Sequence, residues 1–268
     1  MTGAPHSSVK RYRDLARNPP RDGRNRELLL DGFHLLAEAR NSGLAIDNAA
    51  FSHDALSQPL LRTLAEQLQA GGTTVLIVSE QTLASMSPVK TPSGVVGIAR
   101  CNVSTLDDVL AAPRALAVVA HDVQDPGNVG AIMRTAEAAG ATAFVSSPQT
   151  ADPLGWKALR GSMGSALRLP SARAEIGETL QALRRRRIST VALAPRGGRP
   201  LFDAELDKPT ALVVGAEGAG LPADVLAQMD QLISIPMQQP VESLNVGVAT
   251  ALVLYEAFRQ RHTQRERS

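Results

Sequence analysis

The sequence contains a single cysteine, Cys101, which excludes an internal disulfide, and no residues near it have the spacing of a metal site. It contains no apolar run close to the roughly 20 residues that cross a bilayer. Residues 1–20 lack the apolar core of a secretory signal. These absences predict a cytoplasmic protein without a bound metal.

Lysine is scarce, because only four of the 28 basic residues are lysine and the other 24 are arginine. The arginine guanidinium suits phosphate groups and stacks on bases, although a GC-rich genome would favour the same composition. Seven basic residues crowd the first segment: Lys10, Arg11, Arg13, Arg17, Arg21, Arg24 and Arg26. We expect residues 1–22 to form a basic flexible arm, which either contacts phosphates or is merely solvated.

Two α/β domains are predicted from the order of the elements. Up to residue 104 the patterns indicate helices at 25–41, 60–68 and 79–83 and strands at 73–78 and 95–99. After a linker at 105–113, strands alternate with helices. The strands are expected at 115–120, 144–145, 189–194, 211–214 and 232–235, and the helices at 129–139, 177–187 and 244–260. Solidly apolar strands separated by helices predict a parallel sheet covered on both faces.

Ligands of such sheets bind where strands end in loops, and three of these loops carry unusual residues. In the first, Asn128 is placed to cap a helix that Gly140 ends. Arg134 lies off the apolar face of that helix and would reach back over Gly130. The loop therefore indicates a site for an anionic group at a helix start, or else an ordinary capped helix with a surface arginine.

The second loop places glycines around the carboxylate of Glu217. Its residues are Gly215, Ala216, Glu217, Gly218, Ala219, Gly220 and Leu221. The glycines are not in the order of a dinucleotide-binding motif. They allow the backbone to approach a ligand closely, so the loop is either a nucleoside cradle or a tight structural turn.

The third loop runs from Ile235, Pro236 and Met237 into a helix that has almost no polar face. Such a helix is buried by its own domain or by a partner subunit. Ser243 and Asn245 are polar groups at the start of this helix and need partners or a ligand there. Capping by Ser243 would account for one of them, but not for Asn245.

Together the loops resemble the SpoU (TrmH-type) branch of the SPOUT RNA ribose 2′-O-methyltransferases. The motifs are NVGAIMRTAEAAG, VVGAEGAGLP and ISIPMQQPVESLNVGVATALVLYEAFRQR, and the resemblance covers residues 116–261. One departure is Gln239, where the family often has glycine. Residues 25–100 are similar to the ribosomal-protein-like substrate-binding domain of many such enzymes. The resemblance thus implies an RNA substrate-binding domain at 23–104 and a catalytic domain with a trefoil knot at 114–268.

The resemblance also implies a homodimer, S-adenosylmethionine as cofactor, and roles for individual residues. The implied catalytic residues are Asn128, Arg134, Glu217, Ser243 and Asn245. The implied cofactor-binding residues are Gly215, Ala216, Glu217, Gly218, Gly220, Leu221, Ile235, Pro236, Met237, Ser243 and Leu244. Arg134 would act as the base or as the group that stabilises the oxyanion, although a guanidinium has no acceptor for a proton.

The expected substrate is ribosomal RNA, and 23S RNA in particular. A tRNA methyltransferase and a non-catalytic ribosome-assembly factor of the same fold are the alternatives. A nucleotide- or NAD-dependent enzyme is disfavoured by the glycine order and by the lack of a phosphate-binding lysine motif.

Overall fold

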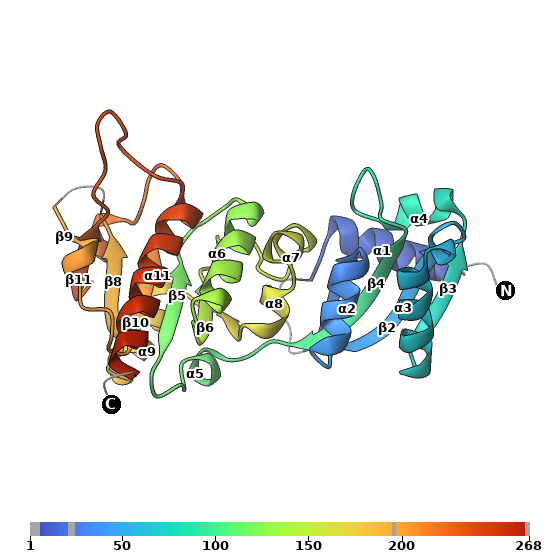
Figure 1. The fold of residues 1–268 in the computed structure, drawn as a ribbon, viewed down its shortest axis with the longest axis horizontal. Helices are drawn as coiled ribbons and strands as arrows, with labels where there is room; N and C mark the ends of the chain where they lie inside the picture. The colour runs from blue at the N-terminus through green and yellow to red at the C-terminus, as the bar shows by residue number, and fades with distance from the viewer. Residues whose placement is uncertain (1–5, 21–24, 195–196, 266–268) are drawn as a thin grey trace. The chain divides into compact units, whose positions relative to one another are not determined.

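The computed structural model describes residues 6–20, 25–194 and 197–265, which form two compact units (Figure 1). Unit 1 consists of Met1–Val103 and Leu154–Arg168, and unit 2 of Ser104–Pro153 and Leu169–Ser268. The first boundary is close to the predicted one. The sequence did not predict that residues 154–168, which lie between two parts of unit 2 in the sequence, belong to unit 1.

Unit 1 is a four-stranded sheet with helices on both faces. Its strands are β1 (Asn25–Asp31), β2 (Ala45–Ser52), β3 (Thr74–Val78) and β4 (Val95–Asn102), in the order β1-β4-β2-β3. Only β2 and β3 run parallel. One face packs on α1 (His6–Arg17) and α4 (Glu80–Met86), and the other on α2 (Phe33–Asn41) and α3 (Pro59–Ala70). The segment 154–168 adds the short helices α7 (Trp156–Ser162) and α8 (Ser165–Arg168).

The helix α1 corrects the prediction of an irregular first segment. Tyr12 and Leu15 are buried against the sheet, and the Tyr12 hydroxyl lies 3.3 Å from the Asn48 carbonyl oxygen. This amphipathic packing provides the stability that a short isolated helix lacks. Residues 6–17 of the predicted arm are therefore part of the folded unit, whereas residues 1–5 and 21–22 lie outside the described residues.

The helix predicted at 25–41 is wrong in its first half, which forms β1. Leu28, Leu29 and Leu30 are buried in succession, as expected for a strand covered on both faces. Gly32, with φ of 97°, then separates the strand from α2. Three consecutive leucines fit a helix or a strand equally well, so periodicity alone did not distinguish them.

Unit 2 contains the predicted parallel sheet, which has seven strands in the order β7-β6-β5-β10-β8-β11-β9. All of its strand pairs are parallel. The bounds are β5 (Leu116–Ala120), β6 (Ala143–Ser146), β7 (Ser171–Arg173), β8 (Ser189–Leu193), β9 (Arg199–Pro200), β10 (Thr210–Val214) and β11 (Gln231–Ser234). The parallel arrangement brings the carboxyl ends of β5, β10 and β11 to one edge.

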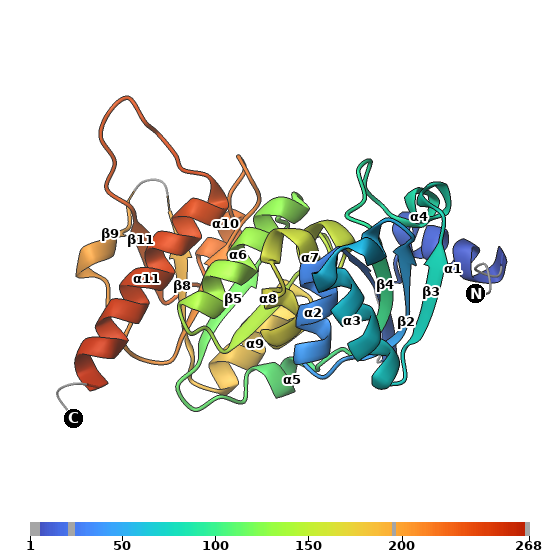
Figure 2. The same ribbon diagram turned by 45° about the vertical axis from the view of Figure 1, so that its right-hand side comes forward.

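Helices cover both faces of the unit 2 sheet (Figure 2). One face packs on α5 (Leu106–Val109), α9 (Ile176–Arg185) and α10 (Ala223–Leu226), and the other on α6 (Pro126–Ala138) and α11 (Val246–Arg265). The predicted linker at 105–113 is not a separate segment, because Val109 and Leu110 are buried in the core of this unit. No helix in the described part of the chain is long and apolar enough to cross a membrane.

The end of α11 is fixed by hydrogen bonds to backbone groups far away in the sequence. The Gln260 side chain donates to the Ala204 carbonyl and accepts from the Leu206 amide, both at 2.8 Å. Arg261 donates to the carbonyl oxygens of four residues: Arg114, Ala115, Leu206 and Lys208. Hydrogen bonds to a charged donor contribute more than neutral ones, so these contacts hold α11 firmly against the sheet.

Candidate active site

The three predicted loops meet at the carboxyl edge of the unit 2 sheet, as the parallel topology requires. Their side chains form a hydrogen-bonded series, the amide–carboxylate chain, which consists of Asn245, Asn128 and Glu217. The Asn245 amide nitrogen lies 3.1 Å from the Asn128 side-chain oxygen. The Asn128 amide nitrogen lies 2.8 Å from a Glu217 carboxylate oxygen. The chain therefore joins α11, α6 and the loop after β10 through three of the predicted catalytic residues.

The start of α6 differs from the prediction, because the N-cap is Asp125 and not Asn128. The Asp125 carboxylate accepts a hydrogen bond of 2.8 Å from the Asn128 backbone N–H, and Pro126 occupies the first helical position. The side chain of Asn128 is thereby free to bridge the two other loops. Asp125 was overlooked because asparagine and aspartate are equally good caps.

Asn245, rather than Ser243, satisfies the first turn of α11. Its side-chain oxygen accepts hydrogen bonds from the backbone N–H groups of Gly247 at 2.9 Å and Val248 at 3.3 Å. Ser243 is exposed. A Cβ on Gly247 would lie only 3.1 Å from the Asn245 oxygen and 3.7 Å from the Ala131 Cβ. Gly247, which was not predicted as a site residue, lets the start of α11 approach α6.

Arg134 lies on the exposed face of α6, four residues after the buried Gly130. Within the part of the chain that the structure describes, its guanidinium has no hydrogen bond or ion pair and does not join the amide–carboxylate chain. An arginine without a protein partner beside a polar site is available to a ligand, and phosphate is the group that its planar donors fit best.

The loop after β10 is a tight turn closed on itself. The Gly220 N–H donates to the Ala216 carbonyl at 2.9 Å, and Gly218 and Gly220 have φ of 83° and 68°. A Cβ on Gly215 would lie 2.3 Å from the carbonyl carbon of Gly220. Glu217, at the exposed tip, also accepts from the Gln124 backbone N–H at 3.4 Å. The loop is thus a tight turn that presents Glu217 to the amide–carboxylate chain, as one of the two alternatives had it; a nucleoside cradle at this loop stays a prediction.

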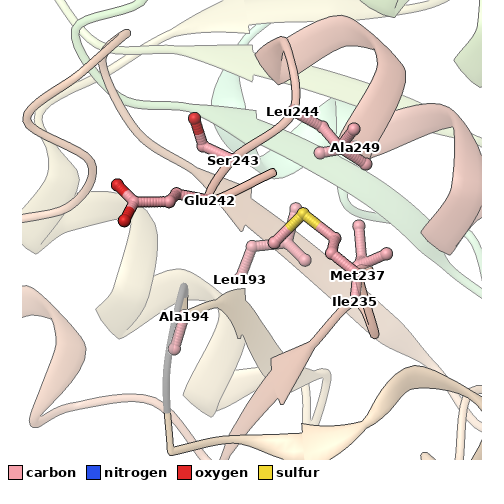
Figure 3. A pocket seen from close by; sticks show the side chains of 8 residues that line it. All are labelled: Leu193, Ala194, Ile235, Met237, Glu242, Ser243, Leu244 and Ala249. Carbon is pink, nitrogen blue, oxygen red and sulfur yellow. The ribbon is translucent and has the colours of Figure 1, made fainter. Parts of the chain in front are cut away.

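A cavity of about 120 Å³ opens beside the third loop (Figure 3). Four predicted cofactor-binding residues line it, namely Ile235, Met237, Ser243 and Leu244. The lining also includes four residues that were not predicted: Leu193, Ala194, Glu242 and Ala249. The walls are largely apolar, with the oxygens of Glu242 and Ser243 as the exceptions. Pro236 and residues 215–221 are not among the lining residues.

Comparison with known proteins shows the family of this chain. Residues 115–255 match the family model described as the SpoU rRNA Methylase family. Residues 6–97 match the MRM3-like substrate binding domain. The two matches cover the parallel-sheet unit with all three loops and most of the smaller sheet.

Individual relatives match most of the chain. The 23S rRNA (guanosine(2553)-2′-O)-methyltransferase RlmP of Bacillus subtilis is 29% identical over 95% of this chain and 97% of that protein. The 23S rRNA (guanosine-2′-O-)-methyltransferase RlmB of Haemophilus influenzae is 36% identical over 75% of this chain and 85% of that protein. The crystal structure of an AdoMet-bound rRNA methyltransferase from Sinorhizobium meliloti has a TM-score of 0.84 at 31% identity, with 97% of both chains covered.

Proposed function

Because this chain belongs to the SpoU rRNA methylase family and is an S-adenosylmethionine-dependent RNA 2′-O-methyltransferase, we propose that it methylates a ribose in 23S ribosomal RNA. The observation that carries the choice of substrate is the extent of the match to RlmP, which includes the N-terminal unit as well as the catalytic unit. Such a reaction takes place in the cytoplasm, where the sequence predicts this protein to be.

The cavity beside the third loop is proposed to hold one part of S-adenosylmethionine, its adenine. Ile235, Met237 and Leu244 offer an apolar surface to an adenine ring, and the Glu242 and Ser243 oxygens suit its polar groups. The close packing of Gly215 on the backbone of Gly220 and Leu221 fixes the shape of the turn, and residues 215–221 are proposed to contact the cofactor from there. When bound, the cofactor would supply a methyl group on a positively charged sulfur: an oxygen nucleophile bonds to the methyl carbon while the carbon–sulfur bond breaks, and the sulfur leaves as a neutral thioether.

The protein side chains orient the RNA for that displacement. Glu217 and Asn128, fixed to each other at 2.8 Å, position the substrate ribose and Arg134. Arg134 binds that phosphate and stabilises the negative charge that develops on the 2′-oxygen. The hydroxyl proton passes to a phosphate oxygen of the RNA, because the Arg134 guanidinium has no acceptor. Ser243 and Asn245 shape the floor of the pocket.

The N-terminal unit is proposed to hold the RNA outside the active site. Lys10, Arg13 and Arg17 are exposed on α1, away from the buried Tyr12 and Leu15. Basic groups on one helix face provide the sequence-independent attraction to phosphates that most RNA-binding proteins need.

The catalytic unit is proposed to contain a trefoil knot and to pair with a second copy through α11. A Cβ on Gly198 would lie 2.7 Å from the Ile233 carbonyl carbon, so the backbone at Gly198 passes very close to β11. Val248, Leu252 and Tyr255 are 50%, 43% and 51% exposed, and their spacing places them on one face of α11. An apolar face of this kind supports a self-complementary interface.

The substitution Leu252→Asp is expected to convert the dimer into a monomer, because it would bury a charge in the centre of that interface. Light scattering during size-exclusion chromatography at micromolar concentration would report the mass. Leu60→Asp, at a leucine of unit 1 that is 69% exposed, is the matched control and should remain dimeric. A wild-type monomer, or a dimer that tolerates Leu252→Asp, would disprove the proposed interface.

The substrate is tested by transfer of labelled methyl groups from S-adenosylmethionine to total RNA from a strain that lacks this gene. Label in the 23S RNA is the expected result. Label in tRNA would keep the chemistry and reject the proposed substrate. A protein that binds the cofactor but labels neither naked RNA nor assembling ribosomal particles would favour a non-catalytic assembly factor.

A further inference from the structure

A second cavity, of about 480 Å³, lies within unit 1 and takes no part in the proposed reaction. It lies where β1 ends and α2 begins, and α3, the loop before β4 and α7 complete its walls. Asp31, Phe33, Leu60, Arg160 and Met163 are among the residues that line it. Its size is in the range of pockets that hold small organic ligands.

A buried carboxylate faces this cavity. The Asp31 side chain is only 4% exposed, and burial raises its pKa. The Ser87 hydroxyl donates to one Asp31 oxygen at 2.8 Å. The nearest Arg160 nitrogen lies 3.9 Å from the other oxygen, beyond hydrogen-bond distance. Among the described residues no donor bonds to that second oxygen, and Asp31 lines the cavity, so this oxygen is open to a ligand with N–H groups.

The same cavity also offers donors to an anion, on the side of Asp31 where α2 begins. No side chain caps the start of α2 at Gly32. Phe33, His34 and Leu35 are the first three residues of this helix, so their backbone N–H groups have no acceptor within it. The half-exposed Arg160 adds a full positive charge beside them. Helix starts with free N–H groups bind phosphate readily.

Apolar side chains make up the rest of the wall. Leu60 is 69% and Met163 is 46% exposed at the rim, and Phe33 packs edge to face on His34 with the ring centres 5.5 Å apart. Exposed apolar groups beside an anion site and a carboxylate suit a flat aromatic ligand that carries both a phosphate and N–H donors. A nucleotide has these three features.

We propose that this cavity binds one unpaired guanosine of the substrate RNA, away from the nucleotide that is methylated. Guanine is the base with two adjacent donors, N1–H and the 2-amino group, on one edge, which matches a carboxylate. Adenine and cytosine place an acceptor next to their amino group, and uracil has its single N–H between two acceptors. The inference rests on the proposed RNA substrate, because single-stranded bases splayed into pockets are a common mode of RNA recognition.

The test is fluorescence anisotropy of the full chain with labelled RNAs of the form UUXUU, where X is guanosine, inosine, adenosine, cytidine or uridine. We expect guanosine to bind about tenfold more tightly than inosine, which lacks the 2-amino group, as for other bidentate base contacts. Asp31→Asn should remove this preference. Arg160→Gln should weaken all five RNAs equally, and Arg40→Gln, at an exposed arginine elsewhere on α2, should change none of them.

Equal or undetectable binding of the five RNAs, or a guanosine preference that survives Asp31→Asn, would overturn the proposal. If Asp31→Asn does not fold, Leu60→Glu at the exposed rim takes its place, because added negative charge should repel the phosphate and weaken guanosine binding. The assay does not measure methyl transfer, so its result stands whether or not the proposed reaction is found. In an active enzyme, Asp31→Asn should raise KM and leave kcat unchanged.

Discussion

Arg134→Ala is expected to reduce kcat for methyl transfer to RNA by about 100- to 1000-fold, the effect of removing one group that stabilises a developing oxyanion. The guanidinium is exposed on α6 and has no protein partner in the described part of the chain, so its loss should leave the fold and the cofactor site intact. Single-turnover rates with saturating cofactor would give the effect, and calorimetry would give the affinity for S-adenosylmethionine, which should stay within about twofold of wild type.

Arg185→Ala is the matched control for this experiment. Arg185 is also an exposed arginine, at the end of α9 on the opposite face of the sheet. Its removal should change kcat by less than about twofold, as for most surface substitutions. If Arg134→Ala kept a tenth or more of the wild-type rate, Arg134 would have no catalytic role, although the chain would remain a member of its family.

Gly215→Ala is expected to weaken S-adenosylmethionine binding by about tenfold to 100-fold. The reason is that overpacking costs about 1–3 kcal/mol, and a loss of about 1.4 kcal/mol in binding free energy is tenfold in affinity. The added Cβ would lie 2.3 Å from the Gly220 carbonyl carbon and 2.6 Å from the Leu221 nitrogen. Both are backbone atoms, so the turn must open rather than rotate a side chain aside. Equilibrium dialysis with labelled cofactor measures the affinity, and thermal unfolding shows whether the domain stays folded.

Two other glycine-to-alanine changes calibrate that result. Gly177 lies in α9 with open space around its Cβ position, so Gly177→Ala should not alter cofactor binding. Gly218 also has open space around its Cβ position but has a φ of 83°. Gly218→Ala should therefore lower the free energy of unfolding by about 1–2 kcal/mol, the cost of a left-handed alanine. Unchanged cofactor affinity in Gly215→Ala would mean that the turn after β10 does not contribute to the site.

The parallel sheet and the meeting of three loops were predictable from sequence because the relevant patterns are local. Solid apolar strands alternate with helices, and parallel strands place their carboxyl ends together. That topology brings the loops of Asn128 and Glu217 to one edge, but the hydrogen bond between the two side chains was not predicted. The cap at Asp125 and the approach of Gly247 to α6 could not be predicted, because both depend on backbone geometry within a single turn.

The larger errors arose where tertiary contacts override local pattern. The first half of the predicted helix at 25–41 is a strand because Leu28 to Leu30 pair with β4, and the sequence of β1 does not encode that pairing locally. The assignment of residues 154–168 to unit 1 depends on contacts with β1, more than 100 positions earlier in the chain. The strand at 45–52 was not predicted.

The amide–carboxylate chain has a direction. The Gly247 N–H donates to Asn245, the Asn245 amide donates to Asn128, and the Asn128 amide donates to the Glu217 carboxylate. A side-chain amide both donates and accepts, whereas a carboxylate only accepts, so the two groups cannot be exchanged within this series. Deamidation of Asn128 would leave the shape of the site nearly unchanged and set two negative charges about 3 Å apart. Hydrolysis of this one side chain would therefore be expected to cost activity in a protein that is still folded.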